Sequence, residues 1–296
     1  MSDTAGPTSD VSATVWHAPA PLRPRLSDRW FMALLAVVGG SYLLLIVLML
    51  LADVAYASPW QHLQAILTPE MGHSIRLTLW TCTLSAGMSL LVGVPLGYLL
   101  SRVSFPLRSV VDAVVDLPHV VPPLVLGLSL LLLFHFSWGG SQNSATLENL
   151  SEKWLGLKVA YAPAGIVLAQ FALGGAVATR AMRTVFDQIS PRTEQVAQTL
   201  GASRWQAVWQ VTLPQAKRGM LTALTLAWSR ALGEFGPILI FAGATRGRTD
   251  VLSTTVYLEL QAGKLEAAVA VSLLMVIIAL VVLLVVRQVS GVKSGG

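Results

Sequence analysis

Two ionisable residues, Arg230 and Glu234, stand inside an otherwise apolar stretch of the chain and are four positions apart. On a helix this spacing places both side chains on one face, where they can form an ion pair. A charge at membrane depth is costly unless it is paired and faces protein or water. The pair can therefore lock helix packing or line a path for an ion, and the sequence leaves both interpretations open.

The motifs of several enzyme classes are missing from the sequence. No G-x-x-x-x-G-K-[ST] loop is present to hold a nucleotide phosphate, and no HExxH, GxSxG or Cys/His cluster occurs. Asp112, Asp116 and His119 are interpreted as surface or packing groups rather than proton carriers. The lone Cys82 excludes an intrachain disulfide. We expect a chain that is not an enzyme and that carries no metal and no cofactor of its own.

The composition indicates a solvent other than water. The 296 residues are 54% hydrophobic and only 12% charged, whereas soluble domains carry about a quarter charged residues. The apolar residues form long blocks, each long enough to cross about 30 Å of hydrocarbon as a helix. The sequence therefore predicts an all-α integral membrane protein with six transmembrane helices. The six predicted spans are Phe31–Ala52, Leu77–Leu100, Val110–Phe136, Ala160–Met182, Met220–Ala242 and Glu266–Val286.

The ends of the chain differ from the apolar blocks. Residues 1–27 are rich in Pro, Ser and Ala and are predicted to be a flexible tail. Residues 28–290 are predicted to form a single transmembrane domain, with a cytoplasmic loop at 187–219, and residues 291–296 a short tail. A secretory signal is the competing interpretation of the N-terminal region, but the 22-residue block Phe31–Ala52 exceeds the usual apolar core of about 7–15 residues. A retained first helix is favoured.

The distribution of Lys and Arg sets the predicted orientation. Thirteen of the 20 lie in segments on one side and six on the other, with Arg230 inside a span. The positive-inside bias then places both termini in the cytoplasm. It also explains the net charge of +5 without a nucleic-acid partner. The thirteen are Arg23, Arg25, Arg29, Arg102, Arg108, Arg180, Arg183, Arg192, Arg204, Lys217, Arg218, Arg287 and Lys293, and the six are Arg76, Lys153, Lys158, Arg246, Arg248 and Lys264.

The connection between the fourth and fifth spans is structured rather than a loose linker. In the segment Pro191–Pro214, apolar residues recur at helical spacing before and after Gly201. This pattern predicts two short helices separated at Gly201, with Pro214 ending the second. An interfacial helix anchored by Trp205 and Trp209 is the plain interpretation, and docking of a partner is the functional one.

The same segment resembles the signature cytoplasmic loop of ABC importer permeases, the EAA loop. That loop reads Glu-Ala-Ala, three residues, Gly, nine residues, then Ile-x-Leu-Pro, and the spacing from Gln195 through Gly201 to Pro214 matches it residue for residue. Gln195 stands where the family has Glu, and Glu194 is one place earlier, so either the acidic contact has shifted or an amide replaces it. The resemblance implies coupling to an ATPase subunit through Glu194, Gln195, Val196, Ala197, Leu200, Gly201, Ala202, Leu213 and Pro214.

A wider resemblance runs from Pro118 to Val286. The stretch Leu117–Pro123 and the motif Arg230–Gly236 look like the molybdate/tungstate/sulfate branch of these permeases, closest to molybdate permeases. Prolines in the third span and glycines in the fifth interrupt helices, which membrane proteins tolerate beside cavities or inside protein. A translocation path or gate is therefore expected at Pro118, Pro122, Pro123, Arg230, Glu234 and Phe235, with ordinary proline kinks as the alternative.

The resemblance also implies an architecture and partners. It implies the type I ABC importer permease fold in the bacterial inner membrane, paired as a homodimer and surrounded by lipid. ATP and Mg would be bound by separate ABC ATPase subunits, and an extracytoplasmic binding protein would deliver the anion. Molybdate is the first expectation, with tungstate and sulfate or thiosulfate as alternatives.

Two rival functions remain at this stage. An ion-coupled secondary transporter predicts inverted repeats and intramembrane carboxylates, but Glu234 is the one acid in mid-span and no inverted repeat is evident. An intramembrane enzyme using Asp116, His119 or Glu234 lacks a nucleophile at a recognisable spacing.

Overall fold

The computed structural model describes residues 26–56, 60, 67–137 and 146–289, and every regular element in these ranges is a helix. The chain contacts divide it into two units, one ending at Ala52 and one beginning at Asp53. Helix α1 (Leu26–Tyr56) has an apolar window in which no residue is buried. The predicted tails 1–27 and 291–296 fall almost entirely outside the described residues, so the predicted domain limits stay a prediction.

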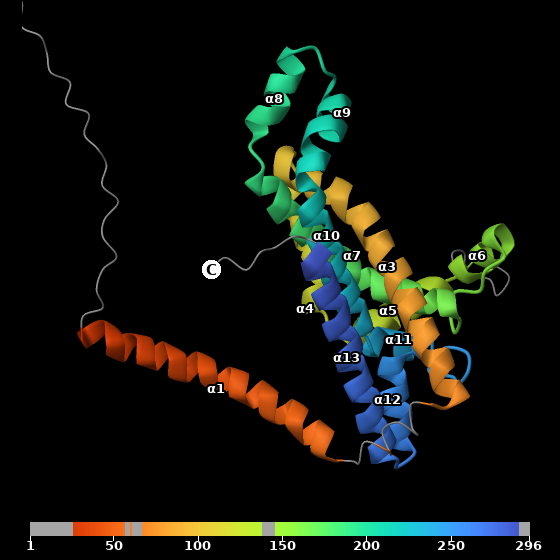
Figure 1. The fold of residues 1–296 in the computed structure, drawn as a ribbon. Coiled ribbons are helices and arrows are strands. Elements are labelled where there is room, and N and C mark those ends of the chain that lie inside the picture. The colour runs from red at the N-terminus through yellow and green to blue at the C-terminus, as the bar shows by residue number, and fades with distance from the viewer. Residues whose placement is uncertain (1–25, 57–59, 61–66, 138–145, 290–296) are drawn as a thin grey trace, which may run out of the picture. The chain divides into compact units, whose positions relative to one another are not determined.

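The second unit is built around α3 (Pro69–Arg102), α7 (Pro163–Gln188) and α10 (Leu213–Leu232), which Figure 1 shows running side by side. Small residues allow α3 and α7 to approach closely. A Cβ added at Gly93 would lie 2.8 Å from Cβ of Ala178, and one added at Gly97 would lie 2.8 Å from Cβ of Met182. Close backbone approach through small residues is typical of helix packing in membranes.

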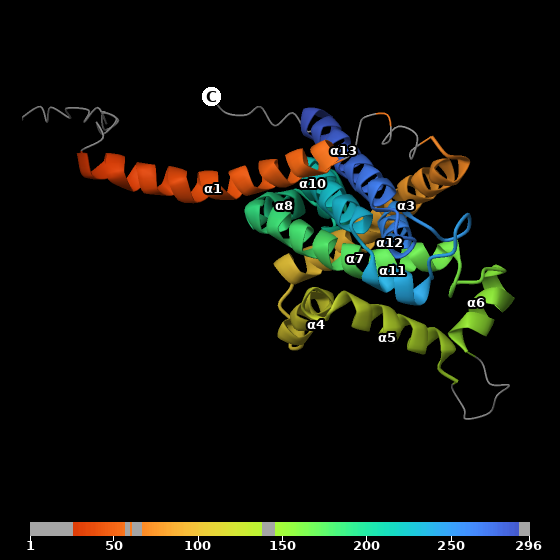
Figure 2. The same ribbon diagram turned by 90° about the horizontal axis from the view of Figure 1, so that it is seen from below.

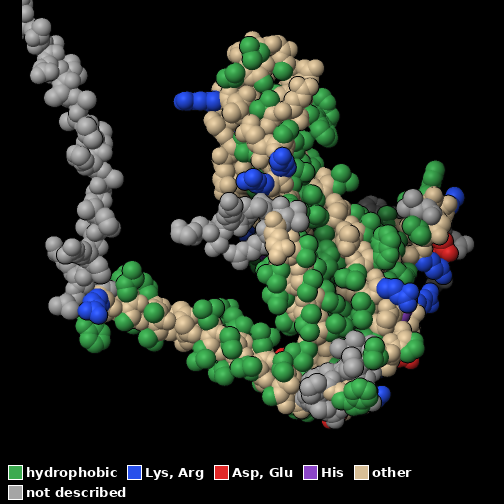
Figure 3. Space-filling view, in the orientation of Figure 1, with side chains coloured by type: hydrophobic (Ala, Val, Ile, Leu, Met, Phe, Trp, Pro, Cys, Tyr) green, Lys and Arg blue, Asp and Glu red, His purple; other side chains and the backbone are tan. Residues whose placement is uncertain are grey.

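The last two helices of the second unit lie next to each other in the chain and in space. Helix α12 (Leu252–Gln261) is followed by α13 (Leu265–Val289), and the two pack against each other. Much of α13 is exposed, and an 18-residue window of its apolar stretch Leu265–Val286 has a mean hydropathy of 3.5. In the space-filling view hydrophobic side chains cover the shafts of the helices, whereas Lys and Arg gather toward their ends (Figure 3). Such a surface suits a hydrocarbon environment between two polar layers.

The third span is interrupted, as its prolines predicted. It forms α4 (Arg108–Val120) and α5 (Pro123–His135), bent by 113° with respect to each other. Val121 and Pro122 both have ψ near 130°, outside the helical region. Proline disfavours the helical conformation of the residue before it, and two consecutive prolines remove two backbone donors, so the helix ends here. A short helix, α6 (Leu147–Leu155), follows α5 in the chain and precedes α7.

The predicted interruption of the fifth span is also confirmed. Helix α10 ends at Leu232, and α11 (Gly236–Phe241) begins after a break at 233–235. Phe235 has φ −124° and ψ −57°, and Pro237 follows at the start of α11, where its missing N–H costs nothing. The break therefore lies where two glycines and a proline interrupt the helical hydrogen bonds.

The predicted count of six spans is not confirmed. Among the described residues four helices are long and apolar enough to cross a membrane, within α1, α3, α7 and α13, and the bent pair α4–α5 makes a fifth if it is one span. These four contain the predicted first, second and sixth spans, and α7 covers all but the first three residues of the predicted fourth. Helix α10 is not among the four, because it carries Lys217, Arg218 and Arg230.

The connection between α7 and α10 extends beyond the ends of the other helices. It consists of α8 (Pro191–Thr199), α9 (Arg204–Ala207) and a π-helical turn (Val208–Thr212) that runs directly into α10. Figure 1 shows α8 and α9 at one extremity of the second unit, and Figure 2 shows α4 and α5 on one side of α7 and α11. The prediction that Pro214 ends the second short helix is wrong, because Pro214 lies at the start of α10. The wider π turn before it accommodates a residue that cannot donate an i→i−4 bond.

Candidate functional site

The turn between α8 and α9 depends on Gly201. Its φ of +92° lies in the left-handed region, where a side chain is strained although no other atom lies within 4 Å of the Cβ position. The Gly201 N–H donates to the Gln198 carbonyl at 3.0 Å and the Ala202 N–H to the Ala197 carbonyl at 3.1 Å. These two bonds form a Schellman motif, which ends α8 sharply. The predicted separation of two helices at Gly201 is confirmed.

Helix α9 begins with its own cap. The Ser203 hydroxyl accepts from the Gln206 N–H at 3.3 Å, and the Gln206 side chain accepts from the Ser203 N–H at 2.8 Å. This reciprocal capping box satisfies donors that the first helical turn leaves free. Together with the Schellman motif it fixes the angle between α8 and α9. The two helices therefore form a defined corner rather than a flexible loop.

Glu194 ties this corner to the body of the unit. Its side chain is 8% exposed, and its Oε1 lies 3.3 Å from Nε of Arg102 at the end of α3. Its Oε1 also accepts from the Thr212 hydroxyl and its Oε2 from the Tyr98 hydroxyl, both at 2.9 Å. Arg102 in turn donates to the Ile189 carbonyl. A buried carboxylate needs such partners, and here they join α8, the π turn and α3.

The outward side of the corner is apolar. Leu200 is 84% exposed and Val196 57%, and Trp205 and Trp209 stand beside each other with ring centroids 5.3 Å apart. Gln195 is also exposed, so the structure places its amide on the surface and the Glu194 carboxylate inside. Ala197, Ala202 and Leu213 are half-buried and Pro214 is exposed. A group of large apolar side chains at an exposed corner is typical of a docking surface.

The two helix breaks lie against each other. A Cβ added at Gly236 would lie 3.1 Å from Cβ of Pro123, and one added at Gly127 would lie 2.8 Å from Cα of Pro237. The break before Pro123 and the break before Gly236 are therefore in direct contact. Pro118 does not take part, because it lies inside α4 rather than at the break. The sequence identified both breaks but gave no sign that they would meet.

Arg230 and Glu234 form the predicted ion pair at this junction. The Glu234 side chain is 1% exposed and that of Arg230 is 36% exposed. The backbone carbonyl of Glu234 accepts from the Ser253 hydroxyl at 2.6 Å, which links the break to α12. Phe235 packs against Tyr257 with ring centroids 5.3 Å apart. The interruption of the fifth span is thus held in place by polar and aromatic contacts with α12.

Helix α4 is held to α7 by two further ion pairs. Asp112 pairs with Arg183, and Asp116 pairs with Arg180. The acids are four positions apart and the arginines three, so each pair lies one turn from the other on both helices. This arrangement agrees with the interpretation of Asp112 and Asp116 as packing groups.

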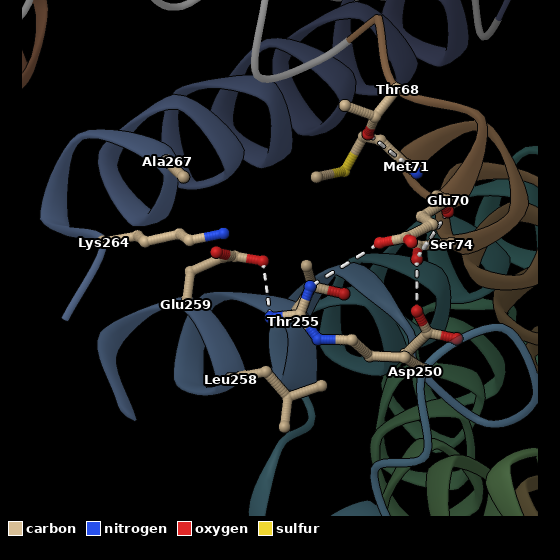
Figure 4. Close-up of a pocket in the computed structure, with 11 residues that line it drawn as sticks. Thr68, Glu70, Met71, Ser74, Asp250, Thr255, Leu258, Glu259, Lys264 and Ala267 are labelled. Atoms are coloured by element: carbon tan, nitrogen blue, oxygen red, sulfur yellow. Dashed lines mark hydrogen bonds and ion pairs between the residues drawn. The ribbon is translucent and has the colours of Figure 1, made fainter. Parts of the chain in front are cut away.

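A polar pocket, which the sequence did not reveal, lies between the start of α3, the 243–251 loop, α12 and the start of α13 (Figure 4). Arg246 is clamped between Glu259 at 2.8 Å and Glu70 at 3.6 Å. The buried Asp250 accepts from the Ser74 hydroxyl at 2.9 Å. The residues that line the pocket are far apart in the sequence and share no motif spacing, so no sequence pattern indicated them. The described residues contain no group of His, Cys, Asp or Glu suited to a metal ion.

Comparison with protein families identifies the chain. Residues 93–291 match the model of the binding-protein-dependent transport system inner membrane component. The chain belongs to this family. As a member it is a multi-pass inner membrane component of an ABC transporter, and the EAA-like segment and both helix breaks lie inside the matched region.

Relatives in this family are similar over most of the chain. The sulfate transport system permease protein CysT of Escherichia coli K12 is 30% identical over 227 residues, which are 76% of this chain and 77% of that protein. The molybdenum transport system permease protein ModB of the same strain is 32% identical over 221 residues, 74% of this chain and 93% of that protein. Sulfate and molybdenum permeases are thus similar to this family member to nearly the same degree.

A solved structure shows the same fold. A chain of a bacterial alginate ABC transporter, crystallised with an alginate-bound periplasmic protein, superposes with a TM-score of 0.70 at 20% identity, over 90% of this family member and 95% of that chain. The predicted permease fold of ABC importers is therefore confirmed at the level of architecture.

Proposed function

We propose that this chain is the membrane-spanning permease subunit of an ATP-driven importer for a small oxyanion. The observation that carries this proposal is the exposed apolar corner around Leu200, which buried Glu194 holds rigidly to α3. A rigid apolar corner suits a groove on another subunit. The similarity to sulfate and molybdenum permeases supports an oxyanion as cargo.

Molybdate is the cargo that we propose first, with tungstate and sulfate or thiosulfate as alternatives. The motif Arg230–Gly236 and the stretch Leu117–Pro123 support the oxyanion branch. The near-equal identities to CysT and ModB keep sulfate in consideration. All these cargoes are tetrahedral oxyanions or close to it, so one path suits any of them.

Coupling would proceed through two routes from the same corner. ATP-hydrolysing subunits, which would bind the ATP and Mg, dock on Val196, Leu200 and the surrounding surface. Their movement reaches α10 through the continuous helix from α9, and it reaches α3 through the Glu194–Arg102 pair. In this proposal Gln195 contacts the partner, whereas Glu194 acts as a positioning residue. Two states coupled in this way must differ in free energy at both sites.

The remaining parts of the proposal concern the assembly. A second copy of this chain would complete the path as a homodimer, and an extracytoplasmic binding protein would deliver the anion. Both termini would lie in the cytoplasm, as the distribution of Lys and Arg favours. The apolar window of α1 lacks buried residues, which supports contact with lipid or with another chain.

An ion-coupled secondary transporter is the second candidate. It would use Glu234 as a proton or cation carrier, but Glu234 is 1% exposed and paired with Arg230. The corner around Leu200 would also be without a purpose in such a protein.

Uptake by the assembled importer tests the proposal. The chain is expressed with its ATPase and binding protein, and uptake of labelled molybdate is measured with excess tungstate, sulfate or thiosulfate as competitor. We expect ATP-dependent uptake that at least one of these anions inhibits. Uptake that persists without ATP and follows an ion gradient would favour the second candidate.

A further inference from the structure

Arg230 occupies an unusual position on the surface of α10. Its side chain is 36% exposed, and Leu226, one turn earlier on the same face, is 47% exposed. Val120 and Leu124, on either side of the α4–α5 break, are 79% and 52% exposed. An arginine within a membrane-spanning segment cannot face lipid at low cost. Its exposed edge must therefore face water or another charged group.

The donors of Arg230 are only partly used. Glu234 is the one carboxylate that the described residues place within ion-pairing distance of it, through Nη1. A guanidinium carries five N–H donors in a planar fork, so the opposite edge is available to a second anion. Arg246 differs, because it is clamped between two carboxylates, and Arg102 differs because it is buried. Both therefore have more of their donors occupied by protein groups than Arg230 has.

A second arginine lies near the same helix break. Arg180 on α7 and Arg230 are both close enough to His119, at the end of α4, to act on it electrostatically. Arg180 is 55% exposed and pairs with Asp116, as Arg230 pairs with Glu234, so each guanidinium is neutralised by one carboxylate. Their exposed edges still offer N–H donors to a small anion that enters this region.

We propose that the exposed edge of the Arg230 guanidinium contacts the oxyanion during its passage, at the junction of the two helix breaks. The inference rests on the proposed function and names the group that meets the cargo. Two parallel N–H donors match two oxygens of a tetrahedral oxyanion, as they match a carboxylate or a phosphate. Broken helices in the membrane are places where transport sites form.

Glu234 is a positioning residue in this site. Because it is nearly fully buried, its carboxylate must stay paired, and it fixes the guanidinium so that the other edge points outward. It also neutralises Arg230 locally, so the oxyanion is held weakly. Weak binding suits a transit site, because an ion that is bound tightly leaves slowly.

The test compares a double variant with a single one in the complete importer. In Arg230→Gln with Glu234→Gln, two amides replace the ion pair at similar volume and leave no buried charge. In Arg230→Lys the charge remains but the two-pronged geometry is lost. Lys264→Gln removes a cation that the described ion pairs do not include and serves as the control. Each importer is reconstituted in liposomes with its ATPase and binding protein.

We expect the double variant to assemble and to hydrolyse ATP, while oxyanion uptake falls about tenfold or more, the loss of a charged hydrogen bond. The number of ATP molecules hydrolysed per transported anion should rise, and the KM of uptake for the oxyanion should change little. The uptake rate of Arg230→Lys should lie between those of the wild type and the double variant. Uptake at the wild-type rate and ATP ratio in the double variant, or in Arg230→Lys if the double variant fails to assemble, overturns the inference. Loss of assembly in both variants also overturns it, because Arg230 would then hold the subunits together. A wild-type importer that moves no oxyanion refutes the proposed function instead.

Discussion

The carboxylate of Glu194 on α8 lies 3.3 Å from the Arg102 guanidinium at the end of α3, and each side chain is 8% exposed. This buried pair connects the protruding corner to the longest helix of the unit. A movement imposed on α8 must therefore move the end of α3 or break the pair. Breaking it would leave two buried charges without compensation.

Substitution of Glu194 should destabilise the unit. Glu194→Gln removes the charge that compensates Arg102, and an unpaired buried charge costs about 3 kcal/mol or more. We expect a lower midpoint of thermal unfolding in detergent and weaker co-purification of the ATPase subunit. Glu152→Gln, on exposed α6, is the control and should change neither. An unchanged midpoint for Glu194→Gln would contradict the positioning role.

Gly201 should be sensitive to substitution for a reason of backbone geometry. Gly201→Ala forces a side chain into the left-handed region at a cost of about 1–2 kcal/mol, although the space around it is open. We expect reduced uptake, and we expect Gly201→Pro to abolish uptake while membrane insertion persists. Gly156→Ala imposes the same kind of strain at the end of α6, where φ is +64°, and should leave uptake nearly intact. Normal transport by Gly201→Pro would show that the corner only anchors the chain.

The apolar corner should matter for docking and not for folding. Leu200 and Trp205 are 84% and 69% exposed, so Leu200→Ser and Trp205→Ala should change the unfolding midpoint little. Both should weaken binding of the ATPase subunit, measured by co-purification and by ATP hydrolysis in the assembled complex. Trp154→Ala removes a 77% exposed tryptophan from α6 and is the matched control. Equal losses of binding in all three variants would argue against a specific surface.

The contact between the two helix breaks should tolerate no added volume. Gly127→Ala would place a Cβ 2.8 Å from Cα of Pro237, and Gly236→Ala would place one 3.1 Å from Cβ of Pro123. Overpacking of this kind costs about 1–3 kcal/mol. The midpoint of thermal unfolding should fall in both variants. Gly175→Ala on α7 is the control, because its added Cβ would meet its nearest atom at 3.6 Å, an ordinary contact. A comparable fall of the unfolding midpoint in this variant would contradict the overpacking explanation.

Local patterns in the sequence predicted the parts of the fold that depend on local chemistry. Apolar blocks indicated α1, α3, α7 and α13, and Gly201 indicated the turn between α8 and α9. Pro122 and Pro123 were recognised as helix breakers, but the 113° bend was not expected. Pro214 was predicted to end a helix but lies at the start of α10. The π turn before it, which has no sequence signature, accommodates a residue without a backbone N–H donor.

The features of the fold and of the site that depend on long-range packing could not be predicted from the sequence. The spacing at Glu194 and Gln195 left open which of the two faces a partner, and only the positions of Tyr98, Arg102 and Thr212 put Glu194 inside. The pocket around Arg246 joins α3 to α12 across more than half of the chain. The contact of the two breaks likewise joins segments that no spacing rule connects.

Replacement of Glu194–Ala202 by a scrambled sequence tests the central claim most directly. The variant is expressed with its ATPase and binding protein, and both ATPase co-purification and oxyanion uptake are measured in the same membranes. The account predicts that the chain still inserts in the membrane while the bound ATPase and the uptake are both lost. Uptake retained without a bound ATPase would contradict it.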